Sequence, residues 1–128
     1  MPHFRIEYSA NLERRMDMPA FCRSMKQAIA VTGLFELGAI RVRAFKAEAY
    51  AVADELPENA FLDMVFRVGE GRSAEQLKQA GDAVFAAAEG ELKHLFATPH
   101  FALSFSIEEI NSALSWKKNG IHPRLRKK

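Results

Sequence analysis

Pro2 is the residue with the most unusual chemical potential in this chain of 128 residues. If Met1 is removed, Pro2 becomes an N-terminal secondary amine at the start of a segment that has the pattern of a strand. Burial disfavours the ammonium form of such an amine, and nearby arginine charges disfavour it further, so both lower its pKa toward neutrality. The neutral amine is then a candidate general base. The alternative interpretation is that Pro2 only begins an edge strand, where a missing N–H does no harm.

Three arginines are candidates for binding the anion on which such a base would act. Arg41 and Arg43 share one face of a predicted strand that we expect to lie beside the first strand, and Arg72 precedes a predicted helix. Guanidinium groups suit planar carboxylates, and a helix N-terminus adds unpaired N–H groups and a favourable dipole. Arginines that converge on one place would therefore bind a di- or tricarboxylate. The alternative for the strand arginines is an exposed face on which acidic residues pair with them.

Other chemical signals in the sequence are weaker. Residues 69–74 (GEGRSA) superficially fit a dinucleotide fingerprint. Such a fold needs an acidic residue at the end of the next strand, about 20 residues on, but here the predicted helix itself runs past Glu91, and the chain has no second half-fold. The four histidines have no metal-ligand spacing, and a single cysteine gives no zinc framework. Ser104 and Ser106 lack a nucleophile-elbow sequence, and Cys22 falls on the apolar stripe of a predicted helix. We therefore predict no metal site.

Hydrophobic periodicity predicts two copies of a β-α-β unit, over about residues 2–50 and 61–109. Alternating apolar residues predict strands over residues 2–8, 40–45, 61–68 and 102–107. Helical spacing predicts one helix from an N-cap at Asp17 to Gly33, and a second from a capping box at Ser73 and Gln76 to Thr98. We expect a short extension around Trp116 and then a loose basic tail.

Together these elements predict an α+β fold, with a four-stranded mixed sheet and two helices on one face. The units could form a ferredoxin-like sheet, or two parallel pairs related by a pseudo-twofold axis, and periodicity alone does not distinguish them. Several of the predicted strands have apolar residues that we place on both faces (Met64, Val65 and Phe66; Leu103 and Phe105). We interpret this as an uncovered apolar face, which favours an oligomer.

The charge distribution argues against several functional classes. Six of the eighteen basic residues lie in the last twelve positions, which hold no acid, so residues 1–116 carry a formal charge of −4. An acidic body with a basic tail does not favour nucleic-acid binding. No apolar run approaches the roughly 20 residues of a membrane helix, and charges interrupt any N-terminal signal sequence. The single cysteine fits a reducing cytoplasm, where we expect the protein to act.

Four segments in order resemble the 5-carboxymethyl-2-hydroxymuconate isomerase family of the tautomerase superfamily. They are residues 1–4 (MPHF), 39–43 (AIRVR), 69–76 (GEGRSAEQ) and 103–109 (LSFSIEE). The resemblance implies a tautomerase-like domain over residues 1–118, followed by a basic tail over 119–128. It also implies a homotrimer without a cofactor. The implied reaction is the 1,3-allylic keto-enol isomerisation of a muconate-type tricarboxylate in homoprotocatechuate degradation.

The resemblance assigns catalytic roles to Pro2, Arg41 and Arg72, and we add Arg43 as a substrate-binding residue. The second unit departs from the first, because Leu62 stands where a second proline would be and Ser104 stands near the place of a second strand arginine. We therefore expect one active site per chain. The alternatives are a related tautomerase for another unsaturated keto acid, a non-enzymatic oligomer that binds small carboxylates, and nucleic-acid binding by the tail.

Overall fold

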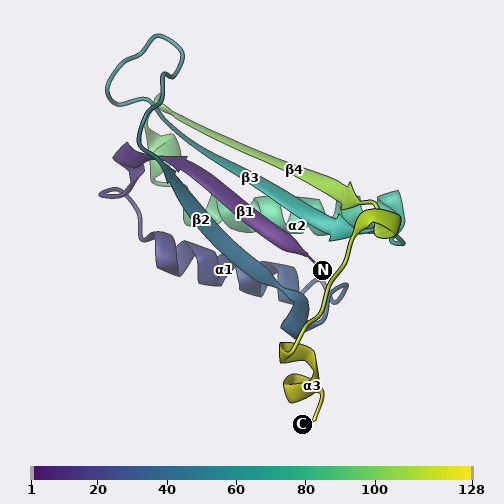
Figure 1. Ribbon diagram of the computed structural model, residues 1–128. Coiled ribbons are helices and arrows are strands. Elements are labelled where there is room, and N and C mark those ends of the chain that lie inside the picture. Colours follow the sequence, from purple (N-terminus) through teal and green to yellow (C-terminus); the bar gives the residue numbers. More distant parts are fainter. Residues whose placement is uncertain (1, 128) are drawn as a thin grey trace.

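The sheet consists of two parallel strand pairs placed side by side (Figure 1). The computed structural model describes residues 2–127. The strands β1 (His3–Ser9), β2 (Arg41–Ala47), β3 (Ala60–Gly69) and β4 (Phe101–Ile110) have the spatial order β2-β1-β3-β4. The pairs β1/β2 and β3/β4 are parallel, and β1 meets β3 antiparallel at the centre. The predicted α+β fold is confirmed, and of the two arrangements the chain adopts two parallel pairs.

Two helices cover one face of the sheet. Helix α1 (Met18–Ala30) connects β1 to β2, α2 (Ala74–Glu91) connects β3 to β4, and the two helices pack against each other. The side chain of Asp17 accepts a hydrogen bond from the Ala20 N–H at 3.0 Å, and Ser73 and Gln76 form the reciprocal capping box. Both predicted helix starts are confirmed. Helix α2 ends earlier than predicted, and a short 3-10 turn, η3 (Leu95–Ala97), follows it.

The hydrophobic core lies between the sheet and the two helices. Alternate residues of the two central strands point into it, and α1 and α2 contribute one stripe each. The fully buried large side chains include Phe4, Ile6, Leu62, Met64, Phe66, Met25, Ile29 and Val84. Burying a side chain of this size contributes about 1.5–3 kcal/mol, so the central strands are the most firmly held part of the fold.

The uncovered face of the sheet is charged, which corrects the expectation that it is apolar. Leu103 and Phe105 pair in register with the buried Leu62 and Met64, so they lie on the face covered by the helices. Val65 does lie on the open face, but it is surrounded by polar neighbours in the sheet. The polar residues of that face are His3, Arg5, Glu7, Arg41, Arg43, Asp63, Arg67, Ser104, Ser106 and Glu108. In β4, the alternating Phe101, Leu103, Phe105 and Ile107 lie on the covered face. Ile110 lies on the open face, where Phe45 of β2 and Phe61 of β3 are the other large apolar residues.

The chain after β4 returns to the edge where β1 begins and ends in a short helix, α3 (Ile121–Arg126) (Figure 1). The connections before it include the 3-10 turns η1 (Ala10–Leu12), η2 (Leu37–Ala39) and η4 (Ser112–Leu114). Helix α3 packs against η2, so the described part of the predicted basic tail is folded rather than loose. Lys128, at the end of that tail, and Met1 lie outside the described residues. Within residues 2–127, no helix is both long enough and apolar enough to cross a membrane.

Candidate active site

Pro2 stands directly before β1 and is buried at the wall of a cavity of about 540 Å³. Phe35 and Arg72 line the same cavity, and the C-terminal segment closes it from the other side. The sheet positions Pro2, because the next residue, His3, already pairs with both neighbouring strands. The nitrogen of Pro2 is therefore held at the end of a rigid element, where a positioned base is most effective.

Arg72 reaches from the turn before α2 to the loop before β2. Its Nε and Nη2 donate hydrogen bonds to the Leu34 carbonyl at 3.3 and 3.0 Å, and its Nη1 donates to the Gly69 carbonyl at 3.3 Å. The guanidinium carbon lies 4.1 Å from the ring centre of Phe35. These contacts fix the plane of the group, and two of its five N–H bonds remain to bind an anion in the cavity.

Arg41 and Arg43 lie on either side of the His3 ring. Arg41 Nη2 is 3.3 Å from His3 Nε2, and Arg43 Nη1 is 3.2 Å from His3 Nδ1. Burial and the charges of Arg41, Arg43 and Arg67 lower the pKa of His3 from 6.5 to about 4, so the ring is neutral at pH 7. A neutral imidazole has one acceptor nitrogen, and therefore only one of the two arginines donates to it at a time.

Arg41 also has a polar atom that no described residue satisfies. Its Nε is buried and has no hydrogen-bond partner within residues 2–127. A buried donor left without a partner costs about 1–3 kcal/mol, and an anion bound beside Arg41 would remove that cost. The feature favours a ligand at this place.

Arg41 lines a second cavity, of about 410 Å³, together with His3, Arg67 and the segment from Ile110 to Lys118. This cavity adjoins the first, because Pro2 and His3 are consecutive residues and Lys117 lines both cavities. The structure therefore brings Pro2 and Arg72 into one cavity and Arg41 into its neighbour. Arg43 is not among the residues that line these two cavities.

The joined cavities are strongly cationic. Glu36 is the one acidic residue among their lining side chains, and the hydrogen bond and charge of Arg126 lower its pKa. The lysines and arginines that line them are Arg41, Arg67, Arg72, Lys117, Lys118 and Arg126. The chain thus builds a local positive site on an acidic body, as a polycarboxylate ligand requires.

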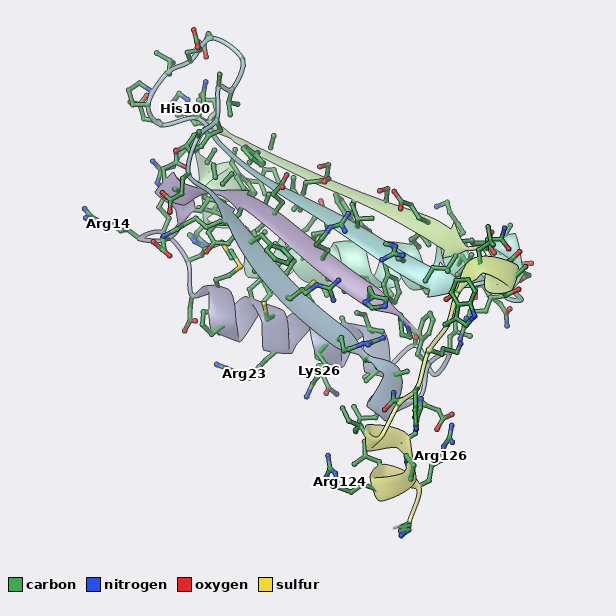
Figure 2. All side chains as sticks on the ribbon, in the orientation of Figure 1. Arg14, Arg23, Lys26, His100, Arg124 and Arg126 are labelled. Carbon is green, nitrogen blue, oxygen red and sulfur yellow. The ribbon has the colours of Figure 1, made fainter. Side chains whose placement is uncertain are left out.

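Sequence reasoning missed the contribution of the C-terminal segment and of His3. Lys117, Asn119, His122 and Arg126 line the Pro2 cavity, whereas the sequence indicated only a tail. The sequence did contain a signal for His3. His3 alternates with apolar residues in its own strand, and Arg41 and Arg43 alternate in the same way in the strand predicted to lie beside it, so all three are expected on one face of the sheet. Of the remaining histidines, His122 lines the Pro2 cavity, whereas His100 lies at the end of the sheet away from α3 (Figure 2). Within residues 2–127, no group of three His, Cys, Asp or Glu residues could hold a metal ion.

The model of a family described as 5-carboxymethyl-2-hydroxymuconate isomerase matches residues 2–125. A curated relative, the 5-carboxymethyl-2-hydroxymuconate Delta-isomerase of Escherichia coli, is 34% identical over 122 residues, which are 95% of this chain and 97% of that protein. The crystal structure of a 5-carboxymethyl-2-hydroxymuconate isomerase from Deinococcus radiodurans R1 has a TM-score of 0.91 and 36% identity. The superposed region covers 98% of this chain and 94% of the Deinococcus radiodurans R1 protein.

A more distant similarity concerns the fold alone. A fused 4-OT described as a wild-type symmetric trimer has a TM-score of 0.65 at 15% identity. The superposed region covers 91% of this chain and 93% of the fused 4-OT chain. The arrangement of strands and helices therefore extends well beyond the close relatives, and the residues of the site carry the distinction between activities.

Proposed function

This chain belongs to the 5-carboxymethyl-2-hydroxymuconate isomerase family, and from that membership we propose that it isomerises 5-carboxymethyl-2-hydroxymuconate between its enol and keto forms without a cofactor. It is an isomerase with the tautomerase-like fold. The observation that carries the proposal is the position of Pro2, because Pro2 and Arg72 line one cavity and Arg41 lines the cavity beside it. The proposed base and the two proposed anion-binding groups thus line adjoining cavities.

The proposed reaction is a proton transfer through Pro2 after removal of Met1. The neutral Pro2 nitrogen takes the proton of the 2-hydroxyl group, and the oxygen becomes a carbonyl as the double bonds shift along the conjugated chain. The resulting Pro2 ammonium then gives a proton to the far carbon, which restores the neutral amine. Burial and the surrounding cations lower the pKa of such an amine, and a base near the working pH contributes about 10²–10⁴ in rate.

Arg41 and Arg72 are proposed to bind carboxylates and to stabilise the charge that develops during the transfer. Arg72 is already oriented by two backbone carbonyls and a phenyl ring, so it needs little reorganisation when charge appears. Arg41 has a buried, unsatisfied N–H directed at no described partner. Arg43, which contacts His3, is proposed to support substrate binding by holding that ring and the Arg41 side chain in place.

We propose that the active form is a cytoplasmic homotrimer. Solved proteins with this fold include one described as a symmetric trimer. The exposed apolar side chains after β4 support an assembly, since Leu114 and Trp116 are 70% and 86% exposed in the single chain. Large apolar side chains exposed in this way are typical of contacts with a neighbouring subunit.

The direct test follows ketonisation of 5-carboxymethyl-2-hydroxymuconate by ultraviolet absorbance, with mass spectrometry of the same sample. We expect catalysis from chains that begin at Pro2, and only the solution rate from chains that retain Met1, because an amide nitrogen is not a base. A chain that retains Met1 and remains fully active would disprove the role of Pro2. A chain that begins at Pro2 and has no activity would disprove the proposed substrate.

A further inference from the structure

The segment that follows β4 is held across the mouth of the site at two points. At one end, the Ser112 N–H donates to Glu70 Oε1 at 2.6 Å, beside the turn that carries Arg72. At the other end, Asn119 Nδ2 donates to the Gly38 carbonyl at 2.9 Å. The residues between these anchors pass the N-terminal end of β1 (Figure 1). This path determines which side chains of the segment lie beside the cavities.

Helix α3 fixes the second anchor. A Cβ atom on Gly38 would lie 2.9 Å from His122 Nδ1 and 3.3 Å from the backbone of the same residue, so the helix approaches η2 as closely as glycine allows. Arg126, labelled on α3 in Figure 2, forms a two-pronged hydrogen bond with Glu36. The segment is therefore a docked part of this chain's own site.

Lys117 is the cation that this path places between the two cavities. It lines the cavity of Pro2 and Arg72 and also the cavity of His3 and Arg41. Within residues 2–127, the Lys117 ammonium forms no ion pair or hydrogen bond, whereas Arg126 is bound to Glu36. An ammonium on a flexible stem with no intramolecular partner can turn toward an anion in either cavity.

We propose that Lys117 binds the carboxymethyl carboxylate of the substrate, an inference that rests on the proposed function. The substrate has a carboxylate at each end of its conjugated chain and a third on a CH2 arm, which is attached to the carbon that also bears one of the terminal carboxylates. Arg41 and Arg72, in the two cavities, are assigned to the chain ends. With that end of the chain held by Arg41 or Arg72, the arm carboxylate needs a further cation beside the same cavity, and Lys117 lines both cavities. Lys117 is thus a specificity-determining residue rather than part of the proton transfer.

The test compares Lys117→Ala with Lys127→Ala, which removes the same charge from a residue that lines neither cavity. Each variant is assayed with 5-carboxymethyl-2-hydroxymuconate and with 2-hydroxymuconate, which lacks the carboxymethyl arm. For Lys117→Ala we expect the KM of the tricarboxylate to rise about tenfold, with kcat changed less than about twofold. The contact with the arm carboxylate is made equally in the bound substrate and in the transition state, so its loss weakens binding without slowing the reaction step. The KM of the dicarboxylate should change less than about twofold, and Lys117→Arg should restore most of the binding.

Three results would contradict the assignment in different ways. Equal KM values for Lys117→Ala and Lys127→Ala with the tricarboxylate would overturn it. An equal rise in KM for both substrates would show that Lys117 does not recognise the carboxymethyl arm. A wild-type chain that starts at Pro2 and acts on neither substrate would overturn the proposed function itself, and with it the premise of this inference.

Discussion

The two β-α-β units share their architecture and differ where their first strands begin. In the first unit, Pro2 precedes β1 and borders a cavity. In the second unit, the corresponding Leu62 lies inside β3 and has no solvent exposure. Both residues are buried, but only Pro2 precedes its strand and lines one of the two cavities of the site. The duplicated fold therefore provides two similar frames, and the proposed base belongs to the first.

The registers of the two parallel pairs show a second difference. His3 pairs with Arg41 in the first unit, and Asp63 pairs with Ser104 at the corresponding place in the second. The Ser104 hydroxyl donates to Asp63 Oδ1 at 2.6 Å, which satisfies both groups. The first pair instead leaves a buried guanidinium nitrogen without a partner. Similar pairing thus leaves a buried donor without a partner among residues 2–127 in one unit and gives a hydrogen-bonded polar pair in the other.

Two single substitutions at the matched positions, Pro2→Ala and Leu62→Ala, should distinguish a loss of catalysis from a loss of core packing. Pro2→Ala should lower kcat by about 10²–10⁴, since the rigid secondary amine is lost, with little change in the free energy of unfolding. Leu62→Ala should lower the free energy of unfolding by about 2–5 kcal/mol through a cavity in the core, and kcat per folded chain should be retained. Steady-state kinetics and urea unfolding measure the two effects. A large loss of kcat in both variants would mean that the second unit also contributes to the chemistry.

The strand positions Arg41 and Ser104 provide the next matched pair. Arg41→Ala should lower kcat/KM by about 10²–10³, the usual cost of removing one donor that stabilises developing charge. Ser104→Ala should leave kcat/KM within about twofold of the wild type, because its hydrogen bond serves only the second unit. Comparable losses in the two variants would remove the functional distinction between the units.

The turn before α2 belongs to the second unit yet supplies Arg72 to the site of the first. Arg72→Lys keeps the charge but loses the planar fork that two carbonyls orient, and we expect kcat/KM to fall about tenfold, or about 1.4 kcal/mol. Ser73→Ala, one residue on, should cost about 1 kcal/mol of stability through the lost helix cap and leave kcat/KM unchanged. Full activity in Arg72→Lys would show that a point charge is sufficient there.

The sequence predicted the elements of both units well, because their signals are local. Alternation in the strands depends only on which face is buried, and the caps at Asp17 and Ser73 depend on residues three positions away. The doubled β-α-β pattern was also visible. The choice between two sheet arrangements was not, because it depends on which strand edges meet at the centre, and periodicity within a strand carries no information about its neighbour.

Pro2, Arg41 and Arg72 could be selected from the sequence, but their surroundings could not. The contact of His3 with two arginines depends on the register between β1 and β2, which a single sequence does not specify. The docking of α3 depends on a close approach at Gly38, more than eighty positions earlier in the chain. The same limit explains why the apolar residues of the strands were interpreted as an uncovered apolar face, since alternation within one strand does not reveal which side the helices cover.

The pairing of His3 with the arginines predicts a difference in acid stability between the units. The pKa of His3 is about 4 in the folded chain and 6.5 without its surroundings, so the unfolded chain binds more protons between these values. The stability that depends on neutral His3 is therefore complete above pH 6.5 and is lost as the pH falls toward 4. We expect this loss to be about 1 kcal/mol, because solvent screens a ring that is only partly buried.

Denaturant unfolding of the wild type and of His3→Gln from pH 8 to pH 4.5 measures this loss. The carboxylates titrate in both proteins, so the difference between the two curves isolates His3, and the variant should show the shallower decline. Parallel curves would mean that His3 remains protonatable between the arginines, and that the first unit is no more sensitive to acid than its copy.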